Sequence, residues 1–128
     1  MPLVKFYLRK GKSQEYLRSV ADAVHEALVA QANVPPDDRF QVIHELADNA
    51  LIAHPSYGGV NRSKDVVTIE ITFNIGRTVE IKKNLYADIV RRLQESADVR
   101  PDDVVIVLLE VVKENWSFGG GRATYATE

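Results

Sequence analysis

VPPDDRFQVIHE, residues 34–45, is followed 65 positions later by VRPDDVVIVLLE, residues 99–110. The two stretches agree at six of twelve positions, and in each a Pro-Asp-Asp turn precedes an apolar run. Proline and aspartate are turn residues, and a short apolar run after a turn indicates a strand. The recurrence therefore predicts that the chain is a duplication in which each copy ends in a strand.

The segments before the two stretches also follow one order. An alternating strand at 3–9 precedes a helix that is capped by Ser13 and ends near Ala32, ahead of a strand at 40–45. In the second half, an alternating strand at 67–73 precedes a helix capped by Thr78. The run at 104–112 then predicts a strand buried on both faces. Residues 46–65 are irregular and predict a loop with at most one short strand.

This order predicts an α+β fold made of two β-α-β units. Each unit has a right-handed crossover, so two units side by side give a four-stranded sheet with both helices on one face. We expect one domain over residues 1–128, with halves at about 1–64 and 65–128. The other face of the sheet is left bare, and its burial requires other subunits.

Composition excludes several classes of protein. The 16 Lys and Arg residues against 18 Asp and Glu residues argue against nucleic acid or a membrane as the main partner. The absence of cysteine excludes a disulfide framework and a thiolate nucleophile. His25, His44 and His54 lack the spacing of a zinc site, so no metal is expected. No apolar run is long enough for a membrane span and no signal peptide is recognisable, which predicts a soluble cytoplasmic protein.

Pro2 is the first candidate for chemistry. Methionine before a small residue such as proline is normally removed in cells, and removal would leave Pro2 as a free secondary amine. Burial lowers the pKa of such an amine, whereas a nearby carboxylate raises it. Pro2 is then a candidate general base, general acid or imine-forming nucleophile. The alternative is that proline at this position serves only to permit removal of methionine.

Asp38 and Arg77 are the second and third candidates. Asp38 either shapes a proline-stiffened turn or orients a water molecule or the Pro2 amine. Arg77 lies where a strand ends and a helix begins, a place that favours anions, and a guanidinium there can hold a carboxylate through two parallel hydrogen bonds. The alternative for Arg77 is a surface ion pair with Glu80.

Trp116 and Phe118 are the remaining candidates. Two aromatic residues two positions apart in a strand face the same side and can form the wall of an apolar pocket. They are equally suited to fill a subunit interface. The glycines at 119–121 that follow them do not match a phosphate-binding loop.

Taken together, these residues resemble the tautomerase superfamily, and in particular its malonate semialdehyde decarboxylase subgroup. The resemblance spans essentially the whole chain and is carried by MPLVKF at 1–6, VPPDDRFQ at 34–41, GRT at 76–78, PDDV at 101–104, NWSFG at 115–119 and RA at 122–123. It implies a tautomerase-like fold, a homotrimer with active sites at its interfaces, and no cofactor. It also implies that Pro2 is the catalytic amine, that Asp38 assists it or activates water, that Arg77 binds the substrate carboxylate, and that Trp116 and Phe118 form an aromatic wall.

The resemblance leaves the reaction open. Some decarboxylases of the subgroup carry a second arginine two positions before the one matched by Arg77, where this chain has Ile75; others have a small or apolar residue there. Decarboxylation of a small oxo acid such as malonate semialdehyde, with a cationic Pro2 and hydration as a side activity, is the reading we favour. Keto–enol tautomerisation of a phenylenolpyruvate type, with a neutral Pro2, is the alternative. A trimeric interaction protein without enzymatic activity is the third.

Overall fold

The computed structural model describes residues 1–126. Six main elements follow one another: β1 (Leu3–Arg9), α1 (Gln14–Gln31), β2 (Phe40–Leu46), β3 (Val67–Asn74), α2 (Val79–Ala97) and β4 (Val104–Val111). Short 3-10 turns lie at Asp48–Ala50, Pro101–Asp103 and Lys113–Asn115. The order of elements confirms the two β-α-β units, and the division of the chain near residue 64 stays a prediction.

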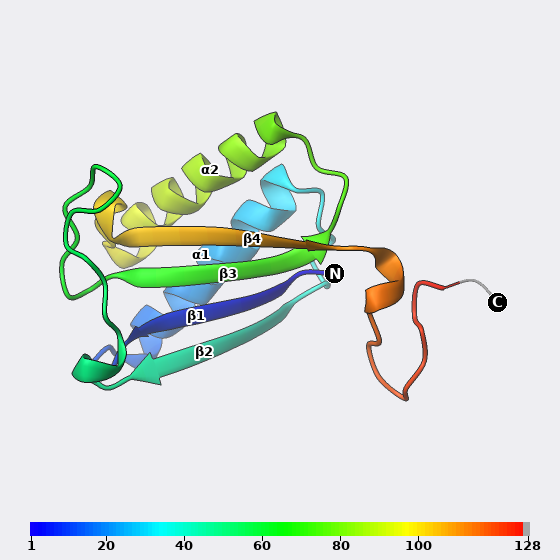
Figure 1. Ribbon diagram of the computed structural model, residues 1–128, viewed down its shortest axis with the longest axis horizontal. Coiled ribbons are helices and arrows are strands. Elements are labelled where there is room, and N and C mark those ends of the chain that lie inside the picture. Colours follow the sequence, from blue (N-terminus) through cyan, green and yellow to red (C-terminus); the bar gives the residue numbers. More distant parts are fainter. Residues whose placement is uncertain (127–128) are drawn as a thin grey trace.

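The four strands form one mixed sheet in the order β2-β1-β3-β4 (Figure 1). β1 is parallel to β2 and β3 is parallel to β4, whereas the central pair β1 and β3 is antiparallel. Both helices pack against the same face of the sheet (Figure 1). The predicted fold class is therefore confirmed, and the opposite face of the sheet is left without a layer from residues 1–126 of this chain.

The core lies between the helices and the sheet. Because successive side chains of a strand point to opposite faces, every second residue of β1 and β3 is buried. Full burial of one such side chain, for example Phe6, contributes about 1.5–3 kcal/mol relative to exposure. The principal core residues are Val4, Phe6, Leu8, Ile69, Ile71 and Phe73 from the sheet and Val24, Leu28, Leu85, Ile89 and Leu93 from the helices.

Both helices begin at the predicted caps. The Ser13 hydroxyl accepts a hydrogen bond from the backbone N–H of Tyr16 at 3.0 Å, and the Thr78 hydroxyl accepts one from Ile81 at 3.2 Å. These bonds satisfy backbone donors that a helix start otherwise leaves free. Neither of the two α-helices in residues 1–126 has the length and apolar character needed to cross a membrane.

One local expectation needs correction. β4 is an edge strand and is not buried on both faces, since Val107 and Leu109 remain 44% and 42% exposed on the side away from the helices. The loop after β2 is irregular, as predicted, and holds a 3-10 turn at Asp48–Ala50. This loop is fixed by a side chain, because the Arg9 guanidinium donates hydrogen bonds to the carbonyls of Asp48, Leu51 and Lys64.

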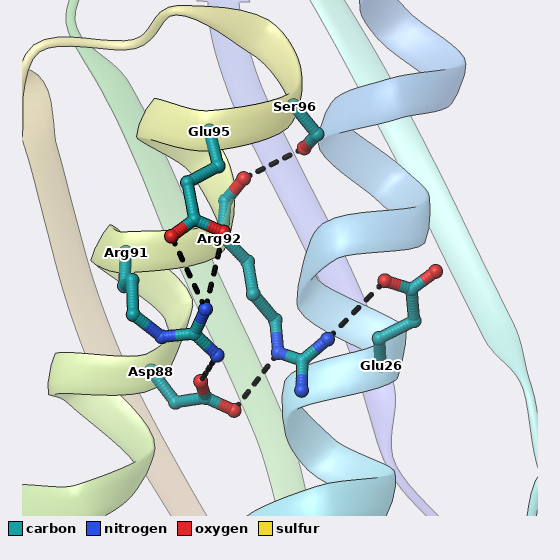
Figure 2. A network of polar contacts seen from close by, with 6 residues as sticks. All are labelled: Glu26, Asp88, Arg91, Arg92, Glu95 and Ser96. Atoms are coloured by element: carbon teal, nitrogen blue, oxygen red, sulfur yellow. Dashed lines mark hydrogen bonds and ion pairs between the residues drawn. The ribbon is translucent and has the colours of Figure 1, made fainter.

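A charged network joins the two helices on their outer side (Figure 2). The buried carboxylate of Asp88 on α2 accepts hydrogen bonds from Arg91 at 2.6 Å and from Arg92 at 2.9 Å. Arg92 also reaches Glu26 on α1 at 3.4 Å, and Arg91 reaches Glu95 at 3.1 Å. Burial alone would raise the pKa of Asp88, but the hydrogen bonds from Arg92 and Arg91 outweigh it and hold the pKa below its ordinary value.

Replacement of Asp88 by asparagine is expected to lower the free energy of unfolding by about 1–2 kcal/mol at pH 7, the scale of lost hydrogen bonds to a charged group. A depressed carboxyl pKa in the folded state stabilises the protein above the unfolded-state pKa, and this stabilisation is lost as the pH falls through the folded-state pKa. Urea unfolding at pH 7 and at acidic pH should therefore show a difference between the two proteins that shrinks on acidification. Glu95→Gln, at an exposed partner, is the control and should change stability by less than about 0.5 kcal/mol.

Candidate active site

The end of the sheet where β1 begins brings Asp38 to the N-terminus. The Met1 ammonium lies 3.4 Å from Oδ2 of Asp38 and donates a hydrogen bond to the hydroxyl of Tyr125 at 2.8 Å. β2 is parallel to β1 with Phe40 opposite Leu3, so the turn before β2 lies beside the start of β1. Pro2 itself is buried. The structure thus places Asp38 beside the segment that holds Pro2, as the functional reading of both residues requires.

The ammonium in contact with Asp38 belongs to Met1, while the nitrogen of Pro2 is part of a peptide bond in the chain described here. Consecutive Cα atoms are about 3.8 Å apart, so a free amine on Pro2 would lie one residue from this position. A cation and a carboxylate at such a distance attract each other, although the Asp38 side chain is partly open to solvent, which weakens the attraction. Asp38 therefore places a carboxylate beside the start of β1.

The duplicated Pro-Asp-Asp motif has two different uses in the structure. Asp103, the counterpart of Asp38, is only 1% exposed and accepts hydrogen bonds from the backbone N–H and the hydroxyl of Ser63, both at 2.6 Å. Arg100 also reaches it at 3.4 Å. Asp103 therefore fixes the loop before β3, which is the structural role that the motif alone suggests. Asp38 instead directs a carboxylate oxygen at the N-terminus.

Arg77 lies at the same end of the sheet but on its helix side. Its Nη2 and Nε donate to the carbonyl oxygen of Ala32 at 2.9 and 3.2 Å, and its Nη1 donates to that of Asn74 at 3.1 Å. The guanidinium stacks on the Phe73 ring, 4.2 Å from its centroid. These carbonyl contacts replace the ion pair with Glu80 that the sequence offered as an alternative.

Within residues 1–126, no carboxylate forms an ion pair with Arg77. Burial lowers the pKa of its guanidinium and the nearby Glu110 carboxylate partly opposes this, but arginine remains protonated near neutral pH. Asn74 connects Arg77 with the N-terminus: its carbonyl accepts from Arg77, and the β1–β3 register, continued from the Leu3–Thr72 pair, places Met1 opposite Asn74. A second, partly desolvated cation therefore lies near the start of β1.

Trp116 and Phe118 form an aromatic cluster, though not by the predicted route. They follow the 3-10 turn at Lys113–Asn115 rather than lying in a strand. Their rings meet edge to face with centroids 5.8 Å apart, and the Trp116 indole donates to Oδ1 of Asn74 at 2.7 Å. Phe118 also meets the ring of Tyr125 edge to face at 5.1 Å. The tail after β4 therefore places three aromatic rings beside the N-terminus.

Sequence reasoning missed Asn74 and Tyr125. A signal for Asn74 existed, because a buried Trp N–H needs an acceptor, and Asn74 ends an alternating strand two residues before Gly76. Tyr125 carried no such signal, since it lies in a tail without periodicity. Its hydroxyl is nevertheless the hydrogen-bond partner of the N-terminal ammonium.

A cavity of about 440 Å³ lies at the opposite end of β1 and is lined by Arg9, Lys10, Lys12 and Lys64, among others. Two of its cations already have partners: Arg9 donates to three carbonyl oxygens and Lys12 pairs with Asp65 at 2.9 Å. We therefore place the candidate site at the N-terminal end of β1. Across residues 1–126, the His, Asp and Glu side chains form no group of three that could hold a metal ion.

Comparisons with known proteins identify the family and the fold of this chain. Two family models, both described as tautomerase enzyme, match residues 38–119 and 2–61. The probable tautomerase YusQ of Bacillus subtilis (strain 168) is 38% identical over 123 residues, which cover 96% of this chain and 97% of YusQ. A malonate semialdehyde decarboxylase inhibited by 3-bromopropiolate superposes with a TM-score of 0.90 at 37% identity, covering 96% and 93% of the two chains. A second malonate semialdehyde decarboxylase, for which decarboxylase and hydratase activities are described, gives 0.89 at 32% identity, covering 94% and 93%.

Proposed function

Because this chain belongs to the tautomerase family, we propose that it is an enzyme that uses the amine of an N-terminal Pro2 on a small oxo acid. The reaction we favour is decarboxylation of malonate semialdehyde to acetaldehyde and carbon dioxide. One observation supports the proposal: Asp38 and Tyr125, 3.4 and 2.8 Å from the Met1 ammonium, lie at the start of β1 beside an aromatic cluster, one residue from the Pro2 nitrogen. The proposal requires that Met1 be removed.

In this mechanism the cationic Pro2 polarises the aldehyde in one of two ways. It donates a hydrogen bond to the aldehyde oxygen, or it transfers a proton to that oxygen and its freed nitrogen attacks the carbonyl carbon, which forms an iminium ion with release of water. Arg77 exchanges its carbonyl partners for the substrate carboxylate and holds it out of the carbonyl plane. The carbon–carbon bond to the carboxylate then breaks, and its electron pair moves towards the polarised carbonyl or iminium ion as carbon dioxide leaves. A proton adds to the remaining carbon, and in the iminium route water then releases acetaldehyde and the amine.

The neighbouring groups support the cationic form of Pro2. Asp38 and the Tyr125 hydroxyl contact the ammonium of Met1, which lies one residue from the nitrogen of Pro2. Once Met1 is removed, the Asp38 carboxylate would attract a positive charge on Pro2. Trp116 and Phe118 exclude water from one side of the substrate, which favours loss of charge from its carboxylate. Asp38 is also placed to direct a water molecule in a hydration side reaction.

Keto–enol tautomerisation is the second candidate. It uses the same residues with Pro2 neutral, so that the amine accepts a proton from one carbon or oxygen and returns it to another. Ile75, which is 59% exposed and stands two residues before Arg77, favours this candidate because it gives the same end of the sheet apolar surface where a second guanidinium would stand. An enol with an apolar substituent, such as phenylenolpyruvate, suits that surface.

We also propose that three copies of the chain assemble and cover the bare face of the sheet. Phe40, Val107 and Leu109 expose large apolar side chains in the sheet of the single chain. Burial of such a face against further copies removes this apolar area from water. Light scattering is expected to give three times the 14.3 kDa mass of one chain. We further propose that the protein is cytoplasmic and uses no cofactor. Neither a nucleic acid nor a membrane is proposed as a partner.

A panel of substrates tests the function. Protein that lacks Met1 by intact mass is mixed with malonate semialdehyde, with phenylenolpyruvate and with an uncharged aldehyde. We expect acetaldehyde and carbon dioxide from the first, weaker ketonisation of the second and no reaction of the third. Rapid ketonisation without decarboxylation would move the assignment to a tautomerase. Absence of turnover of either acid by trimeric protein lacking Met1 would contradict the proposal.

Replacement of Asp38 by asparagine is expected to shift the pH dependence of kcat/KM. Without the carboxylate the cationic form of Pro2 is less favoured, so the apparent pKa of the alkaline limb should fall and activity should be lost at lower pH than in the wild type. A pH–rate profile of both proteins measures this shift. Asp37→Asn, at the adjacent exposed residue, is the matched control and should keep the wild-type profile; a shift of equal size in both variants would contradict a specific role for Asp38.

A further inference from the structure

We propose that the ion pair between Lys82 and Glu110 is a positioning device for Arg77. By holding Glu110, Lys82 prevents that carboxylate from binding the Arg77 guanidinium and so keeps Arg77 free for the substrate carboxylate. The inference rests on the proposed function, in which Arg77 binds that carboxylate. Lys82 and Glu110 are positioning residues here, since neither is argued to touch the substrate.

Glu110 lies beside Arg77 because of the strand register. In the parallel pair β3–β4, Glu110 is directly opposite Phe73, so both side chains point to the helix side of the sheet. The Arg77 guanidinium stacks on the Phe73 ring at 4.2 Å. Neighbouring strands are about 4.8 Å apart, which places Glu110 within reach of a modest movement of Arg77.

Lys82 holds Glu110 from the first turn of α2. Its Nζ lies 2.8 Å from Oε1 of Glu110, and the two side chains are only 24% and 29% exposed. Lys82 is positioned by the helix start, since its backbone N–H donates to the carbonyl of Thr78, the residue that follows Arg77. Arg77 and Lys82 therefore both belong to the corner between β3 and α2. Glu110 faces this corner from the neighbouring strand β4.

The present partners of Arg77 are neutral carbonyl oxygens, which a substrate carboxylate can displace. A free glutamate would be a different kind of partner, because an arginine–carboxylate pair with two parallel hydrogen bonds is among the stronger polar contacts in proteins. Loss of Lys82 would leave Glu110 in that role, and the substrate would have to compete with it. The expected cost is about tenfold in KM, equivalent to one charge-assisted hydrogen bond.

The experiment compares Lys82→Met, Lys82→Arg and the double variant Lys82→Met with Glu110→Gln. Lys83→Met is the control, because it removes the same charge from an exposed neighbouring position. Two readouts are taken: the KM and kcat for malonate semialdehyde, and the ¹H–¹⁵N resonance of the Arg77 Nε–H. We expect Lys82→Met to raise KM about tenfold with little change in kcat and to move the Arg77 resonance. Lys82→Arg and the double variant should restore both readouts, and Lys83→Met should alter neither.

The resonance separates this inference from the proposed function. If no oxo acid is turned over by the wild type, the function fails, but a shift in Lys82→Met that the double variant reverses still supports the positioning of Arg77. An unmoved Arg77 resonance in Lys82→Met overturns the inference, even if KM rises, because repulsion between a free Glu110 and the substrate would then explain the change. A resonance that stays shifted in the double variant overturns it as well.

Discussion

Replacement of Pro2 by alanine is expected to lower kcat/KM for oxo-acid substrates by about 10²–10⁴-fold, the range of a lost acid–base group. Alanine at this position also permits removal of Met1, so the variant keeps a free amine at the start of β1. It loses the secondary amine and the ring that fixes the nitrogen against the buried sheet end. Steady-state kinetics on protein of verified N-terminal mass measures the effect.

Two observations guard the interpretation of this variant. Far-ultraviolet circular dichroism and light scattering should match the wild type, because Pro2 lies before β1 and outside the principal core residues. A Pro2→Ala protein of normal fold and wild-type activity would reject the amine as the reacting group. That result would favour the third interpretation of the sequence, a trimeric interaction protein without enzymatic activity.

Replacement of Arg77 by alanine is expected to lower kcat/KM for carboxylate substrates by roughly a hundredfold, chiefly by raising KM. The reason is the loss of the half-buried guanidinium, whose hydrogen-bond partners within residues 1–126 are carbonyl oxygens. Arg77→Lys keeps the charge but not the paired donors, so it should recover only part of the loss. Steady-state kinetics with malonate semialdehyde separate the expected rise in KM from any change in kcat.

Arg77 also has a structural role that this experiment must separate. Its contacts join the end of α1 at Ala32 to the end of β3 at Asn74, so Arg77→Ala should lower the free energy of unfolding by about 1–2 kcal/mol. Thermal unfolding of each variant measures this loss of stability. A loss of activity that lies in kcat, with KM for the carboxylate substrate unchanged, would contradict carboxylate binding by Arg77.

Much of the fold could be predicted from the sequence because two periodic signals agree. The alternation at 3–9 and 67–73 survives as buried and partly exposed faces of β1 and β3, and both helix caps are where the sequence places them. The position of β4 in the sheet could not be predicted in this way. An apolar run is equally compatible with a central strand and with an edge strand, and in this chain β4 is an edge strand with an exposed outer face.

The candidate site was predictable only where strand pairing determines it. Parallel pairing of β1 and β2 brings Asp38 to the N-terminus, whereas the identical motif at Asp103 is used to hold Ser63, a difference that no local pattern distinguishes. Tyr125 reaches the ammonium through an irregular tail, so its place depends on tertiary contacts alone. The carbonyl partners of Arg77 come from Ala32 and Asn74, which are far apart in the sequence, so these contacts could not be predicted from it either.

Catalysis by the Pro2 amine is tested by a pH titration of the Pro2 nitrogen with ¹⁵N NMR, on protein labelled at proline. We expect the resonance of a secondary amine that titrates, and an apparent pKa that falls when Asp38 is replaced by asparagine. A Pro2 nitrogen with the shift of a peptide bond at every pH would rule out this chemistry, because Met1 would then still be attached and no amine would be present to react.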